Sequence, residues 1–159
     1  MSTRNRRARG PVRGQQRERI WVENDRLDTI GAGAALNIDL CSATNEDAFT
    51  IIRTIIRIQV QNWAAVADLL AFGLLVGRAV DIGSTPILAS MPGLDWSWKG
   101  SIEPTFSGAT VNAGSSYDVD SKSRRKVREL DERYLLCYTN GSAASKNVLT
   151  RARTLIMLP

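Results

Sequence analysis

Alternation of apolar and polar residues is clearest in Ile51–Gln61, which reads IIRTIIRIQVQ. Most of this segment is β-branched, and it contains neither glycine nor proline. Period-two alternation of such residues predicts a half-buried β-strand. We expect the even-numbered positions, from Ile52 to Val60, to face a core, and Arg53 and Arg57 to lie on a wetter face.

Four segments before this strand carry weaker patterns. Gly31–Cys41 begins with small residues and then alternates, which predicts a strand with one wet face. Ile20–Glu23 alternates briefly and predicts either a first strand or a clamp onto a neighbouring chain. Asp25–Asp28 is typical of a turn-like break. Ser42–Phe49 contains a pattern similar to a capping box and is predicted to form one helical turn.

The segments after the central strand predict further strands and two loops. Leu69–Asp81 alternates large with small residues, which predicts a strand buried on both sides. Asp95–Phe106 predicts a short aromatic strand followed by a proline-interrupted loop. Gly83–Gly93 and Gly108–Ser116 are rich in small residues or proline and are expected to be loops, the second one exposed and mobile.

The C-terminal part predicts three more strands. Tyr117–Arg128 alternates, with a ladder of charges on one face, although its residue types also allow a helix over Lys122–Tyr134. Arg133–Thr139 predicts a strand, and the Asn-Gly pair at positions 140–141 is a strong hairpin signal. Asn147–Leu158 predicts the last strand.

These segments give about eight strands joined by short connections, which favours antiparallel pairing. We therefore predict an all-β fold, an antiparallel eight-stranded jelly-roll sandwich, with a Greek-key barrel as the second possibility. At 159 residues and 43% hydrophobic composition, the chain fits one folded domain, which we place at residues 20–159 behind an arm at residues 1–19.

Composition narrows the possible chemistry. The chain contains no histidine, which removes His-based general base catalysis and every metal motif that needs histidine. Cys41 and Cys137 lie in apolar segments without metal-ligand spacing, so we expect free buried thiols. We expect no enzyme, no cofactor and no metal centre. Apolar runs are too short to span a membrane and no signal peptide is visible, so we expect a cytosol-like compartment.

Positive charge is concentrated at the N-terminus. Residues 1–19 carry seven arginines and one glutamate, a net charge of +6, whereas the other 140 residues have a net charge of −1. This arm has too few apolar residues to fold alone and is expected to be disordered or extended. Guanidinium groups suit phosphate contacts, so we predict nucleic-acid binding through these residues. They are Arg4, Arg6, Arg7, Arg9, Arg13, Arg17 and Arg19.

The folded part offers a few further candidates. Additional nucleic-acid contacts are expected at Arg53 and Arg57 if they face inward, and at Arg124 and Lys126, which alternatively pair with acidic residues of a neighbouring subunit.

Asp118 and Asp120 are weak candidates for Ca²⁺ ligands, because two oxygen ligands two residues apart share one strand face. A solvated face, or pairing with Lys122, is the favoured interpretation of these two carboxylates. Tryptophans in loops or near loops can stack on bases, although in β-proteins they are more often core or interface anchors; here they are Trp63, Trp96 and Trp98. The Gly31-Ala-Gly33 sequence lacks the spacing of a phosphate-binding motif.

Taken together, the chain resembles the coat proteins of small icosahedral viruses. The resemblance rests on the arm STRNRRARGPVRGQQRER, the strand Ile51–Gln61, the segment YDVDSKSRRKVRELDERYLLCYTN, predicted as paired strands, and the last strand. The region around Arg124 to Lys126 is most similar to coat proteins of small viruses known chiefly from environmental sequences, with single-stranded DNA or RNA genomes. The arm lacks lysine and no protruding domain is added, which implies a small, smooth particle.

This resemblance implies a capsid protein located in the virion and assembled in the host cytoplasm or nucleus. It would self-assemble into a homo-oligomeric shell of 60 or more copies and package a single-stranded DNA or RNA genome, with no membrane partner. The alternative is a small non-viral RNA- or DNA-binding β-barrel with a basic tail. That alternative explains the arm equally well, but it explains the small-residue face of Leu69–Asp81 and the near-neutral body less well.

Overall fold

The computed structural model describes residues 17–42, 48–61, 69–78, 95–102, 106–107, 110–111, 116–122, 124–128 and 132–159. Within these ranges all regular structure is β-strand. The strands are β1 (Arg19–Ile30), β2 (Ala35–Ser42), β3 (Phe49–Val60), β4 (Leu70–Arg78), β5 (Asp95–Ile102), β6 (Phe106–Ser107), β7 (Thr110–Val111), β8 (Ser116–Ser121), β9 (Arg125–Val127), β10 (Glu132–Asn140) and β11 (Lys146–Met157). In the described part of the chain, no helix has the length and hydropathy needed to cross a membrane.

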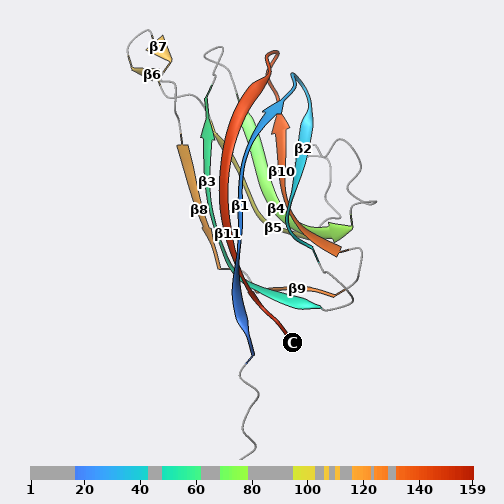
Figure 1. The fold of residues 1–159 in the computed structure, drawn as a ribbon. Coiled ribbons are helices and arrows are strands. Elements are labelled where there is room, and N and C mark those ends of the chain that lie inside the picture. Colours follow the sequence, from blue (N-terminus) through green and yellow to red (C-terminus); the bar gives the residue numbers. More distant parts are fainter. Residues whose placement is uncertain are drawn as a thin grey trace, which may run out of the picture.

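Two antiparallel sheets pack face to face (Figure 1). The first has the order β1-β11-β3-β8, with β9 also pairing with β3, and the second has the order β2-β10-β4-β5. Strands that are consecutive along the chain therefore mostly alternate between the two sheets, as in a jelly roll. The predicted jelly-roll sandwich is confirmed: its two sheets contain nine strands, one more than the eight expected, and β6 and β7 form a separate pair. The described strands form two separate sheets and not a closed barrel.

The central strand β3 shows the predicted alternation, with one irregularity. Thr54 and the even-numbered residues that follow it are buried, whereas Arg57 is exposed. The pairing with β11 shifts between Leu155 and Ile156, so that Ile52 is an extra residue on β3. Because of this bulge, Ile51 faces the core with 1% of its surface exposed, and the expectation that Ile52 does so is wrong.

The first strand is longer than the sequence indicated. All twelve residues of β1 pair with β11, so the turn-like break expected at Asp25–Asp28 is wrong. Backbone pairing with residues 148–151 of β11 keeps these polar residues in the strand. On its surface the Arg26 guanidinium donates to both carboxylate oxygens of Asp28 at 2.7 Å. β1 begins at Arg19, one residue before the boundary expected between arm and body.

The segment 117–128 forms two strands, β8 and β9, separated by a break after Ser121. Burial keeps a period of two across both strands, since Val119 and Val127 are buried while Asp118 and Lys126 are exposed. The alternative helix over Lys122–Tyr134 is therefore wrong for the described residues. β8 and β10 lie in opposite sheets, so the pairing expected within segment 117–140 does not occur.

The side chain of Asn140 links the β1–β2 connection to the β10–β11 connection at one end of the sandwich. Its side-chain amide donates to the carbonyl oxygens of Gly31 at 2.9 Å and Ala144 at 2.8 Å, and its carbonyl accepts the Ser142 N–H at 3.1 Å. The hairpin expected at positions 140–141 is wrong, because β10 and β11 belong to different sheets. The fully buried asparagine instead clamps two connections together.

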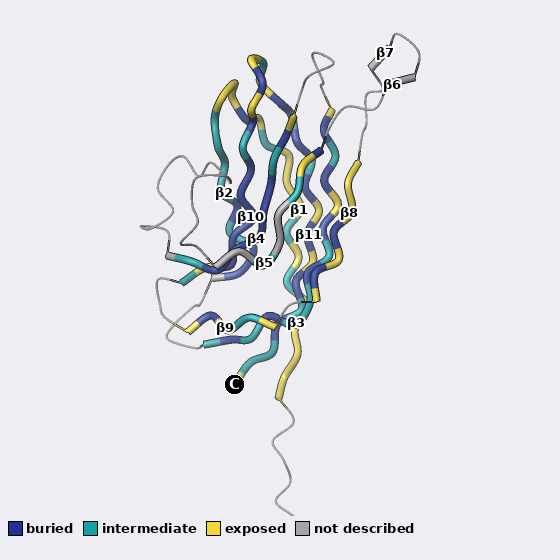
Figure 2. Tube along the Cα trace, turned by 180° about the vertical axis from the view of Figure 1, so that it is seen from behind, coloured by how far each residue is buried: buried dark blue, intermediate teal, exposed yellow. Residues whose placement is uncertain are grey.

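Strand β4 is buried on both faces, as predicted. Leu70, Phe72 and Leu74 lie in the core between the sheets, whereas Leu75 packs with Leu135 and Cys137 in a second cluster. Figure 2 shows mostly buried positions along β4 and β10, while β8 and β11 alternate with exposed positions. Both cysteines are free and buried, which confirms the expectation of free thiols, and burial raises the pKa of each to about 12.

Three expectations concern loops or local turns. The helical turn within Ser42–Phe49 and the loop Gly83–Gly93 lie largely or wholly outside the described residues. The loop expected from Gly108 contains β7, which pairs with β6.

Candidate nucleic-acid interface

The candidate interface lies where the arm joins the first sheet. Arg19 on β1 pairs with Met157 on β11, Met157 pairs with Thr50 on β3, and Thr50 pairs with Lys126 on β9. This register places the arm root and β9 in one row across four strands. The Leu158 N–H donates to the Glu18 carbonyl oxygen at 2.9 Å and extends the pairing toward the arm. Figure 1 shows the start of β1, β9 and the C-terminus at the same end of the molecule.

Four cations share the outer face of this end. Arg19 and Lys126 lie on strands β1 and β9, and Arg17 and Arg128 lie just outside these strands, where they line the same groove as Lys126. All four are exposed. The opposite face is identified by Val127, which is fully buried. We call Arg17, Arg19, Lys126 and Arg128 the basic end.

A groove of about 270 Å³ lies within the basic end. Three of its four cations line the groove; the uncharged residues beside them are Ala48, Phe49, Thr50, Met157, Leu158 and Pro159. Glu132 accepts the backbone N–H of Arg128 at 2.7 Å, a bond that does not involve the guanidinium. The groove therefore combines positive charge with an apolar surface, and no aspartate or glutamate side chain is among its lining residues.

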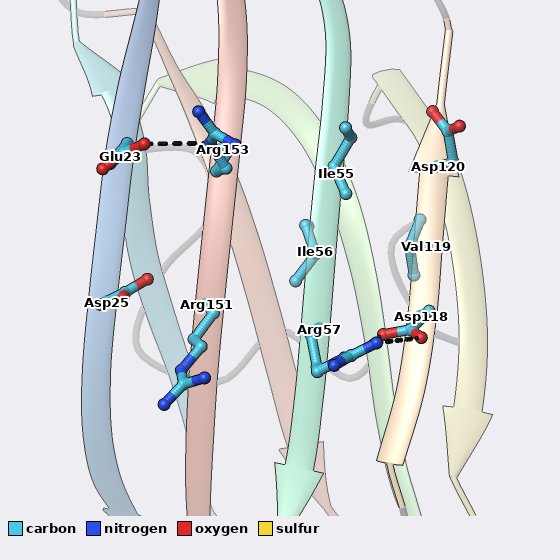
Figure 3. A pocket seen from close by; sticks show the side chains of 10 residues that line it. All are labelled: Glu23, Asp25, Ile55, Ile56, Arg57, Asp118, Val119, Asp120, Arg151 and Arg153. Carbon is cyan, nitrogen blue, oxygen red and sulfur yellow. Dashed lines mark hydrogen bonds and ion pairs between the residues drawn. The ribbon is translucent and has the colours of Figure 1, made fainter.

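Arg53 and Arg57 lie elsewhere on the same face, in a band where charges are compensated. Figure 3 shows the part of this band around Arg57 and Asp118. Arg57 donates to Asp118 through Nε at 2.7 Å and Nη2 at 2.9 Å, and Arg53 donates to Asp120 at 2.8 and 2.6 Å. Both guanidinium groups are thus held in bidentate pairs. The structure does not bring these two predicted nucleic-acid contacts together with the basic end.

On β1 and β11, which form the other side of this band, an arginine is also paired with a carboxylate. Arg153 Nε lies 3.0 Å from Glu23 Oε1, and the Arg153 guanidinium lies 5.3 Å from the centre of the Trp21 ring. Arg151 lies between Asp25 and Arg57 in the register. With four arginines and four carboxylates, this central band has no net charge; its members are Glu23, Asp25, Arg53, Arg57, Asp118, Asp120, Arg151 and Arg153.

Asp118 and Asp120 share a strand face, as the sequence indicated, and each is paired with a guanidinium, while Lys122 adds an electrostatic attraction for Asp120. The hydrogen bonds from Arg57 and Arg53 lower the pKa of Asp118 and Asp120 respectively. Among the described residues, no three Asp, Glu, Cys or His side chains gather into a possible metal site.

The remaining candidates are placed as follows. Arg4 to Arg13 and Trp63 lie outside the described residues, and Arg124 is exposed between β8 and β9. Trp96 and Trp98 belong to β5, where they pair in register with Leu75 and Leu74.

Arg128 ends the ladder of charges expected on one face of Tyr117–Arg128, although it is not among the nucleic-acid contacts named above. The structure brings it to the same groove as Lys126.

Comparisons with known proteins give structural similarity only. No protein-family model and no curated protein matches the chain. The solved structure described as "Cyanophage Pam1 capsid asymmetric unit" is 14% identical, with a TM-score of 0.45, over 100% of this chain and 98% of that chain. The 60-mer of the BFDV capsid protein is 10% identical, with a TM-score of 0.43, over 90% of this chain and 93% of that chain. The decameric BFDV capsid protein is 8% identical, with a TM-score of 0.41, over 91% and 99%. At these identities and TM-scores, structural similarity does not by itself assign a function.

Proposed function

We propose that this chain is the capsid protein of a small icosahedral virus, which self-assembles into a closed shell and packages nucleic acid through its arginine arm. The observation that carries the proposal is the junction of arm and body. The arm enters β1 at the basic end, across β11 and β3 from the cations of β9 and on the same face of the sheet. Arm and body can therefore contact one polyanion together.

The fold supports a structural role. Jelly rolls are the building units of many viral shells, but they also occur in lectins and cupins, so the fold alone does not decide the function. The arm distinguishes this chain, because five arginines stand in its first 13 residues without any acidic residue. Such a segment neutralises phosphates without a fixed backbone shape.

The charge distribution fits the same proposal. Outside the arm the chain is close to neutral, and on the outer face of the first sheet positive charge is concentrated at the basic end while the central band is compensated. A non-viral nucleic-acid-binding barrel would instead present cations and aromatic residues over an exposed barrel face.

The test replaces the five arm arginines from Arg4 to Arg13 with serine in the full chain. We expect wild-type particles to retain nucleic acid after nuclease treatment, and the serine variant to lose most of it, measured by the 260/280 nm absorbance ratio and by gel. The matched control replaces the same five residues with lysine, which keeps their charge, and should retain nucleic acid. Equal nucleic-acid content in the serine variant and the wild type would contradict the role of the arm.

A further inference from the structure

We infer that the basic end is a track for single-stranded nucleic acid, which continues the contacts of the arm onto the folded body. This inference rests on the proposed function and adds a place and a ligand class to it. The track consists of two rows of cations on either side of an uncharged floor.

The two rows lie on the outer strands of this part of the sheet. Arg17 and Arg19 belong to the β1 side, and Lys126 and Arg128 belong to the β9 side, with β11 and β3 between them. Three strand spacings of about 4.8 Å separate the rows by roughly 14 Å. Two residues of extended chain span about 6.6 Å, a spacing for the two cations of each row that suits successive phosphates of an extended strand.

The floor between the rows favours a single strand over a duplex. Met157 and Thr50 form its central pair, and Pro159 and Ala48 follow them at the groove. A partly apolar floor of uncharged side chains can contact the faces of unpaired bases, whereas a duplex stacks these faces inside and exposes only phosphates, sugars and the base edges in its grooves. Cationic rows beside such a floor match the phosphates and bases of one strand.

The central band sets the limit of the track. It lies on the same outer face, and its carboxylates are already paired with arginines or lie beside them in the register. A polyanion gains no net attraction there, so the charge pattern confines it to the basic end. The competing occupant of the basic end is the acidic surface of a neighbouring subunit.

The experiment uses the full chain with Lys126 and Arg128 both replaced by serine. We measure the binding of a fluorescent oligothymidylate of about 20 nucleotides by fluorescence anisotropy over a series of NaCl concentrations. We expect weaker binding and a slope of log K against log salt that is smaller by about 1.4, because two phosphate contacts on a single strand are lost. The matched control, Arg133→Ser with Arg151→Ser, removes the same charge outside the track and should keep the wild-type slope.

Several results would overturn the inference. An unchanged slope in the Lys126/Arg128 variant, or an equal decrease of the slope in the control, would show that these cations do not bind the oligonucleotide. If the same variant lost binding to a duplex of the same length to an equal extent, the track would have no preference for single strands. Wild-type oligonucleotide binding combined with loss of subunit association in light scattering would assign these cations to a neighbouring subunit. If the wild-type chain itself bound no oligonucleotide, the proposed function would fail, not only the track.

Discussion

Buried hydroxyl groups connect the two sheets through the core. The Tyr138 hydroxyl on β10 lies 2.7 Å from Thr150 Oγ1 on β11, and Thr54 Oγ1 on β3 donates to the Tyr134 hydroxyl at 3.0 Å. All four residues are fully buried. Such pairs fix how one sheet sits on the other, because a shift would leave buried hydroxyl groups without partners.

We expect Tyr138→Phe to lower the free energy of unfolding by about 1–2 kcal/mol, because Thr150 loses its partner in the core. Removing both hydroxyl groups in Tyr138→Phe with Thr150→Val should cost less than the sum of the two single substitutions. Urea unfolding of unassembled subunits, arranged as a double-mutant cycle, measures this coupling. Additive single effects would show that the two hydroxyl groups do not interact.

The Arg57–Asp118 pair predicts a pH effect. The pKa of Asp118 is lowered in the folded chain, chiefly by its hydrogen bonds from Arg57, so the stabilisation is complete above the ordinary carboxyl pKa and is lost as the pH falls through the lowered value. We expect Arg57→Gln to unfold at lower urea concentration than wild type at pH 7, with a difference that shrinks in acid. Arg151→Gln removes the same charge but leaves Asp118 paired, so it should keep the wild-type pH dependence. A pH-independent difference would contradict this account.

At the scale of elements, the sequence predicted strands better than connections. Ile51–Gln61 was predicted as a strand because its residues alternate locally, and the structure confirms it. The Asn-Gly pair at positions 140–141 predicts a hairpin that does not form, since local sequence does not specify which sheet the next strand joins. The same limit applies to Asp25–Asp28, whose place in β1 depends on pairing with β11 more than 100 residues away along the chain.

We expect Asn140→Asp to be strongly destabilising, by about 3 kcal/mol or more, although it barely changes the size of the side chain. The aspartate would replace a donor to three carbonyl oxygens, those of Ile30, Gly31 and Ala144, with a buried negative charge facing them. The unfolding midpoint in urea measures this loss. Asn147→Asp, a change of the same chemistry that keeps the oxygen accepting the Thr29 hydroxyl at a partly exposed position, is the matched control and should cost less. Equal stability of Asn140→Asp and wild type would show that the clamp is not needed.

At the scale of the whole molecule, the sequence predicts the concentration of positive charge in the arm, but it does not predict the basic end. Arg17 and Lys126 are more than 100 positions apart along the chain, and only the order β1-β11-β3 with β9 beside β3 brings them to one end. The sequence also could not show that Arg53 and Arg57 are held by Asp120 and Asp118, because that depends on the register of β3 with β8. The proposed function therefore depends on the arrangement of strands as much as on the arm.

The most direct test of the coat-protein account is the size of the protein expressed alone, measured by light scattering and negative-stain microscopy at low and moderate salt. The account predicts closed spherical particles of uniform diameter that contain nucleic acid. A monodisperse species of one to a few chains at both salt concentrations would contradict it and favour a small nucleic-acid-binding protein.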